Sequence, residues 1–185
     1  MALKDLVIAT LDNANVGRIA FNFGPVRVGS AGYTQVKEAV RADRITVVHV
    51  PSLGANRASY RYTHNVFRLG FTSLGGGADK QALLVHEATH AIFDINDMDM
   101  KVKESEAGAY IAQCLFFYYV NEQAIRDGAS PTFADPILRA AWTIAVAATT
   151  NPNIAATSLE PLYRAIADSR QYRDEAENNI DYDGA

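Results

Sequence analysis

The segment LLVHEATHAIFD, residues 83–94, contains the side chains with the clearest capacity for chemistry. His86 and His90 stand four positions apart, and Glu87 follows the first histidine directly. On an α-helix, side chains four positions apart lie on one face, so both imidazoles can reach a single ion. Zn²⁺ accepts nitrogen ligands at about 2.0 to 2.1 Å and, with three protein ligands, keeps a fourth position for water. The spacing therefore predicts a zinc site on a helix.

Glu87 is predicted to be the general base of that site. A zinc ion acidifies the water that it binds, and a neighbouring carboxylate can take the proton and pass it to a leaving amine. The alternative interpretation is a structural helix that contains two histidines and a carboxylate by coincidence. Apolar residues flank the motif, which lies between a predicted sheet and a further predicted helix. This context favours the catalytic interpretation.

The third zinc ligand is expected in the segment KESEAGAYIAQCLFF, which offers Glu104 and Glu106. Because they are two positions apart on a helix, their side chains point about 200° from each other, and only one can face the metal. Glu104 shares its side with Glu122 and Arg126, which indicates a partly solvated face, whereas Glu106 lies in a mostly apolar stripe. A carboxylate in such a stripe needs a partner, which a metal ion would supply. Glu106 is therefore the favoured ligand, and Glu104 is the alternative.

A helical HExxH motif followed by a glutamate on the next helix, in an E-x-x-A context, resembles the gluzincin branch of the zincin metallopeptidases. The matching segment covers only about residues 80–115. The resemblance implies a zincin-like fold, a bound zinc ion, and a sheet edge that holds an extended peptide or protein substrate. It assigns zinc binding to His86, His90 and Glu106, the general base to Glu87, and the substrate edge to the strand around Asn65 to Leu69.

The chain departs from this pattern at the residues that would support the site. Both Glu104 and Glu106 satisfy E-x-x-A, and four residues after Glu106 the aspartate of the thermolysin-like pattern is replaced by Tyr110. Another carboxylate must then orient a ligand histidine, and Asp94, one turn beyond His90, is the candidate. No histidine follows His90, which excludes the metzincin pattern. The candidates for stabilising an oxyanion are Tyr60, Tyr62, His64, Tyr110 and Tyr118.

The first half of the chain is predicted to form a small sheet with helices. An amphipathic helix opens the chain and ends before Gly17, and the segment YTQVKEAVRADR favours a helix with Thr34 as its cap. RIAFNF alternates as a strand does, and ITVVHV, from Ile45, is typical of a buried strand that ends at Pro51. The segment ASYRYTHNVFRLGF indicates a further strand or hairpin before the motif helix.

The second half is predicted to be helical. Helices are expected over about residues 80–93 and 103–126, then from Asp135 and Pro136 to Ala148, and again behind Ser158. The acidic end of the chain, about residues 172–185, is expected to fray. The predicted fold class is therefore α+β, with a small N-terminal mixed sheet followed by a helical half that carries the HExxH helix and the third-ligand helix.

Composition narrows the classes of protein. At 185 residues, the chain fits one domain, and 49% hydrophobic with 21% charged residues is typical of a soluble globular protein. A net charge of −4 argues against nucleic-acid binding, and the single cysteine, Cys114, excludes an internal disulfide and a Cys-rich metal knuckle. The chain lacks the pattern of a signal peptide and any apolar run of membrane-spanning length. We therefore expect a protein that does not enter membranes and is cytoplasmic, unless it is exported by a route that needs no N-terminal signal.

Two functions follow from these patterns. The first is a zinc-dependent metallopeptidase in which Glu87 is the general base for hydrolysis of a peptide bond. The second is a zincin-shaped binding or interaction domain, for example a toxin or regulatory module, with a structural or absent metal and no peptidase activity. The intact Glu87 favours the first function, and the missing aspartate favours the second.

Overall fold

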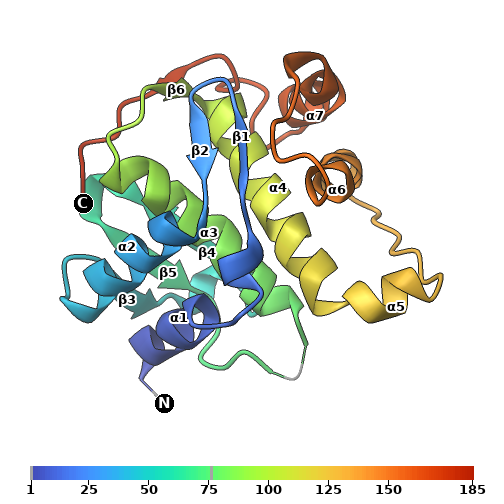
Figure 1. Ribbon diagram of the computed structural model, residues 1–185. Coiled ribbons are helices and arrows are strands. Elements are labelled where there is room, and N and C mark those ends of the chain that lie inside the picture. The colour runs from blue at the N-terminus through green and yellow to red at the C-terminus, as the bar shows by residue number, and fades with distance from the viewer. Residues whose placement is uncertain (1, 76) are drawn as a thin grey trace.

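The computed structural model describes residues 2–75 and 77–185, and within them seven α-helices combine with three small β-sheets (Figure 1). The helices are α1 (Leu3–Leu11), α2 (Ser30–Arg41), α3 (Asp79–Ile95), α4 (Val102–Val120), α5 (Glu122–Arg126), α6 (Pro136–Ala148) and α7 (Ala156–Asp168). The strands are β1 (Phe21–Phe23), β2 (Val26–Val28), β3 (Thr46–His49), β4 (Ala58–Arg61), β5 (Val66–Leu69), β6 (Met100–Lys101) and β7 (Asn179–Ile180). The predicted α+β class is confirmed.

The largest sheet has three strands in the order β3, β5, β4. β5 is parallel to β3 and antiparallel to β4, with Tyr60 opposite Phe67 in the β4–β5 register. The prediction that the strand around Asn65 to Leu69 presents a free edge is therefore wrong, because β5 is paired on both sides. β3 and β4 are the outer strands, and β4 packs beside α3.

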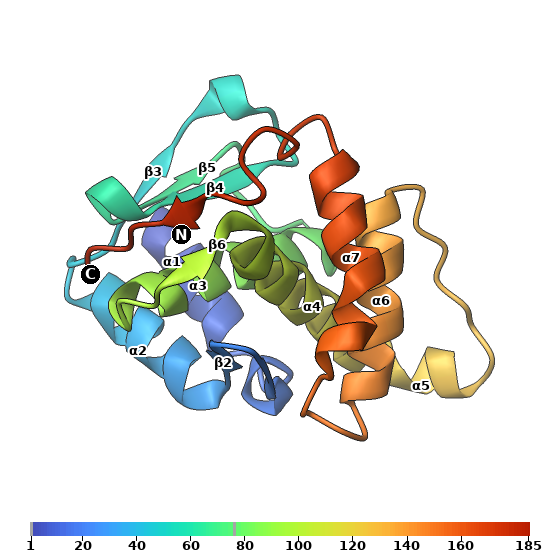
Figure 2. The same ribbon diagram turned by 90° about the horizontal axis from the view of Figure 1, so that it is seen from above.

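The core forms where α3 packs against α4. Fully buried apolar side chains meet there, among them Leu84 and Val85 of α3 and Ile111 and Leu115 of α4. Gly108 permits the close approach, because a Cβ atom at this position would lie 2.8 Å from Cζ of Phe93. α1 and α2 pack on one side of α3, while α6 and α7 lie together beside α4 (Figure 2).

Three local predictions for the first half differ from the structure. The segment predicted as a buried strand from Ile45 is an outer strand, β3, and Val48 is 39% exposed. The sequence predicts only turns around Gly24, but the structure has a strand, β2, directly after them. Gly24, with φ of +47°, lies in the turn of a hairpin that joins β1 to β2. α2 begins at Ser30, so Thr34 lies inside the helix, where its hydroxyl donates to the Ser30 carbonyl oxygen at 3.0 Å rather than capping.

The helices of the second half lie close to their predicted positions. α6 begins at Pro136, and the Asp135 side chain accepts from the Ile137 N–H at 2.8 Å, as a helix cap does. The helix predicted over 103–126 divides at Asn121 into α4 and α5. Within the described part of the chain, no helix is both long and apolar enough to span a membrane.

The C-terminal segment, residues 169–185, is docked on the rest of the protein, so the prediction that about residues 172–185 fray is wrong. β7 pairs antiparallel with β6, and Tyr172 and Tyr182 are buried. Carbonyl oxygens of this segment also accept hydrogen bonds from the first turn of α4: Val102 N–H donates to Asn178 (2.9 Å) and Lys103 N–H to Ala176 (3.0 Å). The first amides of a helix have no partner within the helix, which explains why this polar segment docks. Figure 2 shows it in red, crossing from α7 to a position beside β6.

Candidate metal centre

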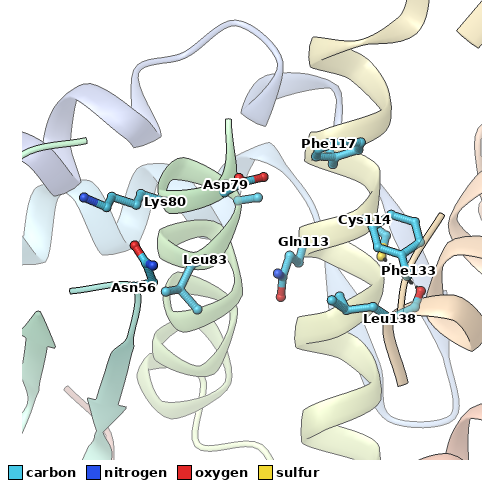
Figure 3. A pocket seen from close by; sticks show the side chains of 10 residues that line it. Asn56, Asp79, Lys80, Leu83, Gln113, Cys114, Phe117, Phe133 and Leu138 are labelled. Carbon is cyan, nitrogen blue, oxygen red and sulfur yellow. Dashed lines mark hydrogen bonds between the residues drawn. The ribbon is translucent and has the colours of Figure 1, made fainter. Parts of the chain in front are cut away.

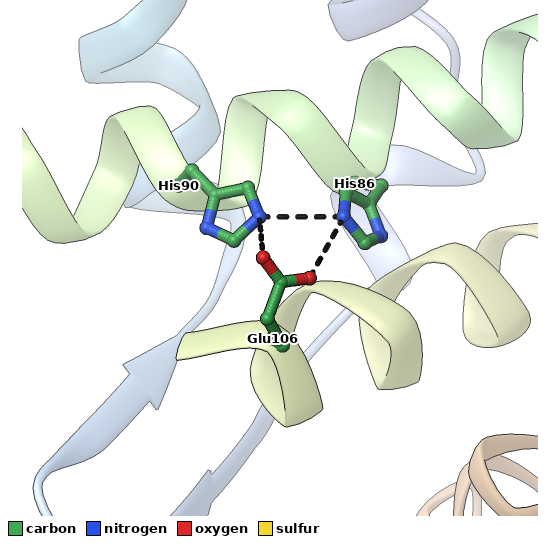
Figure 4. Close-up of side chains that lie close together, drawn as sticks. All are labelled: His86, His90 and Glu106. Carbon is green, nitrogen blue, oxygen red and sulfur yellow. Dashed lines mark hydrogen bonds and ion pairs between the residues drawn. The ribbon is translucent and has the colours of Figure 1, made fainter. Parts of the chain in front are cut away.

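The three favoured ligand residues converge on one point. His86 and His90 extend from α3, and Glu106 extends from α4 toward both (Figure 4). The Nε2 atoms of the two histidines are 3.3 Å apart, and each lies 3.6 Å from an oxygen of Glu106. This group could hold a metal ion.

The separations and the unpaired atoms of this group fit a cation. Ligands about 2.0 to 2.1 Å from a tetrahedral ion lie roughly 3.3 Å from one another, close to the separations found here. Within the described residues, Glu106 Oε2 is buried and has no hydrogen-bond partner. A buried carboxylate oxygen without a hydrogen bond is costly, and an ion between the three residues would remove that cost. The group therefore fits a metal better than a self-contained hydrogen-bond network.

The electrostatics of the metal-free site suit metal binding at two of the three residues. Burial lowers the pKa of His90 to about 4, although Glu106 opposes this shift. Burial acts to raise the pKa of Glu106, but His90 and His86 outweigh it and hold that pKa below its usual value. Burial likewise acts to lower the pKa of His86, but Glu106 and Glu87 outweigh it, so the pKa is raised. At neutral pH, His90 is therefore neutral and Glu106 is ionised, as ligands must be, whereas a metal ion would compete with a proton for His86.

Glu104, the alternative third ligand, does not join this group. Its Oε2 accepts a hydrogen bond from the Lys101 N–H at 2.8 Å, at the start of α4. It lines a separate surface depression with Lys103 and Glu160. The structure therefore brings Glu106, and not Glu104, to the two histidines.

Glu87 lines a cavity of about 210 Å³ together with the three converging residues. Its Oε2 accepts a hydrogen bond from the backbone N–H of Tyr60, on β4, at 2.6 Å. Burial raises the pKa of Glu87 to about 7, with His86 and the Tyr60 N–H acting in the opposite direction. A carboxyl group with a pKa near the working pH can both accept and return a proton.

Asp94 does not orient a ligand histidine, so that prediction is wrong. Asp94 instead accepts hydrogen bonds from the Tyr60 hydroxyl (2.5 Å) and the Asp183 N–H (3.4 Å), and thus links β4 to the C-terminal segment. The second nitrogen of His90, Nδ1, lies 2.8 Å from Oγ of Ser105. Neither Ser105 nor its partner Tyr182 was among the sequence-based candidates.

Only some of the candidates for stabilising an oxyanion lie at the site. Tyr60 and Tyr62 line the cavity, and the Tyr110 ring packs on the His86 ring with centroids 4.5 Å apart. Tyr118 packs against Trp142 instead, and His64 is exposed and contacts Thr63.

Sequence reasoning missed two tyrosines that line the cavity, Tyr172 and Tyr182. The Tyr172 hydroxyl lies 3.3 Å from the Tyr110 hydroxyl, and burial is the first cause of its strongly raised pKa. Both tyrosines belong to the acidic segment that was predicted to fray. The available signal was the presence of two large aromatic residues in an otherwise polar stretch, since such residues gain most from burial.

A second cavity, of about 400 Å³, is lined by residues of α3 and α4, with Gln113 among them (Figure 3). Gln113 is close enough to His86 to contribute to its raised pKa, but it forms no hydrogen bond with Nδ1 of that ring. The lining combines apolar side chains, such as Leu83, Phe117 and Leu138, with polar ones, such as Asp79 and Lys80. Through Gln113, the candidate metal centre thus adjoins a second cavity on the same helix pair.

Comparison of the chain with protein-family models, with curated proteins and with solved structures gives no match. The function is therefore inferred from the geometry of the site and from the chemistry of its residues. Three converging ligand atoms and an adjacent carboxylate are the observations with the most chemical content.

Proposed function

We propose that the chain is a zinc-dependent metallopeptidase of the gluzincin type, with residues 1–185 forming one zincin-like domain. The observation that carries this proposal is the convergence of His86, His90 and Glu106, with the Glu87 carboxylate on the same cavity. The alternative interpretation is a structural helix that contains two histidines by coincidence. It does not explain why Glu106, on a separate helix, lies beside both histidines.

Zinc is a metal that these ligands suit. Catalytic zinc sites commonly combine three histidine or carboxylate ligands with one open position. Calcium and magnesium prefer oxygen ligands, whereas two of the three atoms here are imidazole nitrogens. Cys114 is buried and lines the second cavity, so it is not part of the converging group.

The residues around this group can perform the proton transfers of hydrolysis. A bound zinc ion would lower the pKa of water and polarise a substrate carbonyl. Glu87 accepts a proton from the attacking water and delivers it to the leaving amine, which its pKa of about 7 suits. The Tyr60 N–H holds the Glu87 carboxylate in place at the cavity.

β4 is the strand that an extended peptide would pair with in this proposal. It is an outer strand of its sheet, and Ala58, Ser59 and Tyr60 line the cavity. Outer strands offer unpaired backbone groups to an added strand. The Tyr60 N–H is not among these groups, because it donates to Glu87. The cavity lined by Gln113 would accommodate a side chain of that peptide.

One observation favours the second candidate function, a binding domain without peptidase activity. The cavity at the metal centre is about 210 Å³, below the roughly 300 to 1,000 Å³ usual for ligand sites. Tyr172 and Tyr182 occupy part of its wall. A site of this small size is consistent with a metal that stabilises the fold rather than one that acts on a peptide.

Zinc analysis paired with a chelator-sensitive peptidase assay separates these functions. The proposal expects one zinc per chain after reconstitution and cleavage of at least one member of a diverse peptide library. Less than about a tenth of an equivalent of zinc, at roughly micromolar free zinc, would reject the metal site. Full zinc occupancy without cleavage, in a chain whose Glu87→Gln variant behaves like the wild type, would select the binding domain.

A further inference from the structure

A chain of hydroxyl groups connects the ligand candidate His90 to the C-terminal segment. His90 Nδ1 lies 2.8 Å from Ser105 Oγ, and Ser105 Oγ lies 2.8 Å from the Tyr182 hydroxyl. Ser105 is completely buried and Tyr182 is 6% exposed. Water therefore does not reach Ser105, the middle group of this chain of hydrogen bonds.

The direction of the first hydrogen bond follows from the position of Nε2. An imidazole that binds a metal through Nε2 carries its proton on Nδ1, and the partner of that proton fixes the ring. Ser105 Oγ can accept from the Nδ1–H and still use its own hydrogen toward the Tyr182 oxygen. The Nδ1–H tautomer of His90 satisfies both hydrogen bonds and leaves the lone pair of Nε2 free for a metal ion, whereas the other tautomer directs an Nε2 hydrogen at that position.

His86 lacks such support. Its Nδ1 is buried and has no hydrogen-bond partner among the described residues. The ring is held by packing, chiefly on the Tyr110 ring. Of the two histidines, only His90 is oriented through hydroxyl groups.

The Tyr182 hydroxyl reaches Ser105 because the C-terminal segment is docked. The Tyr182 ring packs edge-on against Tyr62 with centroids 5.3 Å apart. The next residue, Asp183, donates its N–H to Asp94, and β7 pairs with β6 just before. Displacement of the segment would therefore remove Tyr182 from Ser105.

We propose that Ser105 and Tyr182 are positioning residues that hold His90 as its Nδ1–H tautomer, so that metal binding and docking of the C-terminal segment depend on each other. This inference rests on the metal site of the proposed function. Coupling between two equilibria is reciprocal. If docking of the segment raises the zinc affinity by some factor, bound zinc raises the equilibrium constant for docking by the same factor.

Zinc affinity in a set of variants tests the positioning role. Outer-shell partners of a ligand histidine typically contribute ten- to hundredfold to affinity, so Ser105→Ala should weaken zinc binding by about tenfold or more. Tyr182→Phe keeps the ring and removes one hydrogen bond, for an expected loss of about threefold to tenfold. Tyr118→Phe, on the far end of α4, is the matched control and should bind zinc as the wild type does.

The double variant separates this role from a general structural one. If Tyr182 acts through Ser105, Ser105→Ala with Tyr182→Phe should bind zinc no more weakly than Ser105→Ala alone. Additive losses would overturn the inference, as would wild-type affinity in Tyr182→Phe. A wild-type chain without zinc affinity would reject the proposed function and the coupling together, whereas unchanged affinity in Tyr182→Phe rejects the coupling alone.

Nitrogen NMR of the metal-free chain tests the tautomer independently. His90 should carry its proton on Nδ1, and Tyr182→Phe should shift that resonance while Tyr118→Phe should not. A proton on Nε2 of His90 would overturn the inference. Amide hydrogen exchange gives the reciprocal measurement: zinc should slow exchange in β7, and equal rates with and without zinc in a chain that binds zinc would contradict the coupling.

Discussion

The α3–α4 helix pair and the C-terminal segment meet at the metal centre, but different forces hold them in place. The helix pair is joined by fully buried apolar side chains, such as Leu84 and Ile111. The segment buries few large side chains, mainly Tyr172 and Tyr182, and its other attachments are polar. Apolar packing depends little on pH and salt, whereas polar docking depends on both. The helix pair should therefore set where the ligands are, and the segment should adjust how well they bind.

The largest effect is expected from the ligands that the helix pair brings together. Glu106→Gln should weaken zinc binding by more than about a hundredfold, beyond the usual cost of an outer-shell change. Glu104→Gln is the matched control, because its carboxylate contacts the Lys101 N–H instead. His86→Ala should lose zinc and hydrolysis together. Metal titration of the three variants checks this, and a larger loss in Glu104→Gln would transfer the ligand role to Glu104.

The next effect separates chemistry from metal binding on one helix. Glu87→Gln preserves size and helix preference but cannot accept a proton, so peptide hydrolysis should fall by at least about a hundredfold. Zinc content and thermal stability should remain those of the wild type. Single-turnover cleavage and zinc analysis of the same preparation measure both, and joint loss of zinc and activity would mean that Glu87 has a structural role.

A smaller effect tests the packing of the helix pair. Gly108→Ala gains about 1 kcal/mol of helix preference but places a Cβ atom 2.8 Å from the buried Phe93 ring, and overpacking costs about 1 to 3 kcal/mol. The free energy of unfolding should therefore fall. Gly17→Ala meets no atom within 4 Å and serves as the control. Urea denaturation would show equal stability of the two variants if the close approach were unimportant.

The smallest effect concerns the C-terminal segment. Hydrogen bonds from Lys101 and Lys103 lower the pKa of Glu177 to about 2. Because the folded pKa is depressed, this stabilisation is present above the unfolded value of about 4.3 and is lost as pH falls through the folded value.

Protection of β7 amides in the metal-free chain should therefore decline as pH falls from about 4 to 2, and also with added salt. In the Glu177→Gln variant, protection of the β7 amides should be weaker and should lack the part of the pH dependence that Glu177 causes. The change should be small, since the three side chains are at the surface. An identical pH profile in variant and wild type would show that the ion pairs do not hold the segment.

The helix pair could be predicted because its signals are local. The spacing of His86 and His90 defines one helix face, and the apolar neighbours of Glu106 distinguished it from Glu104. Helix periodicity and the cap at Asp135 located the helices of the second half closely. Each of these inferences needs only residues within a few turns of one another.

The remaining features depend on pairing between distant segments. The position of β5 between β3 and β4 cannot be read from its own residues, since it requires a parallel partner. The support of His90 likewise combines Ser105 with Tyr182, which is far along the chain. Asp94 satisfied the spacing rule for a histidine partner, but the Tyr60 hydroxyl takes its carboxylate. Local spacing shows which side chains can reach a carboxylate such as that of Asp94. It does not show which of them forms the hydrogen bond when a distant residue is also within reach.

The hydrogen bonds between the first turn of α4 and the C-terminal segment also bear on the order of folding. Val102 and Lys103 donate to carbonyl oxygens of residues 178 and 176, and the same helical turn carries Ser105 and leads into Glu106. Contacts between residues so distant in sequence form late, because the loop between them must first close. During synthesis, both histidines emerge well before this turn acquires its distant partners. The support that the C-terminal segment gives to the ligand set is thus added late in folding, which delays the tightest metal binding until residues 176–182 have been made.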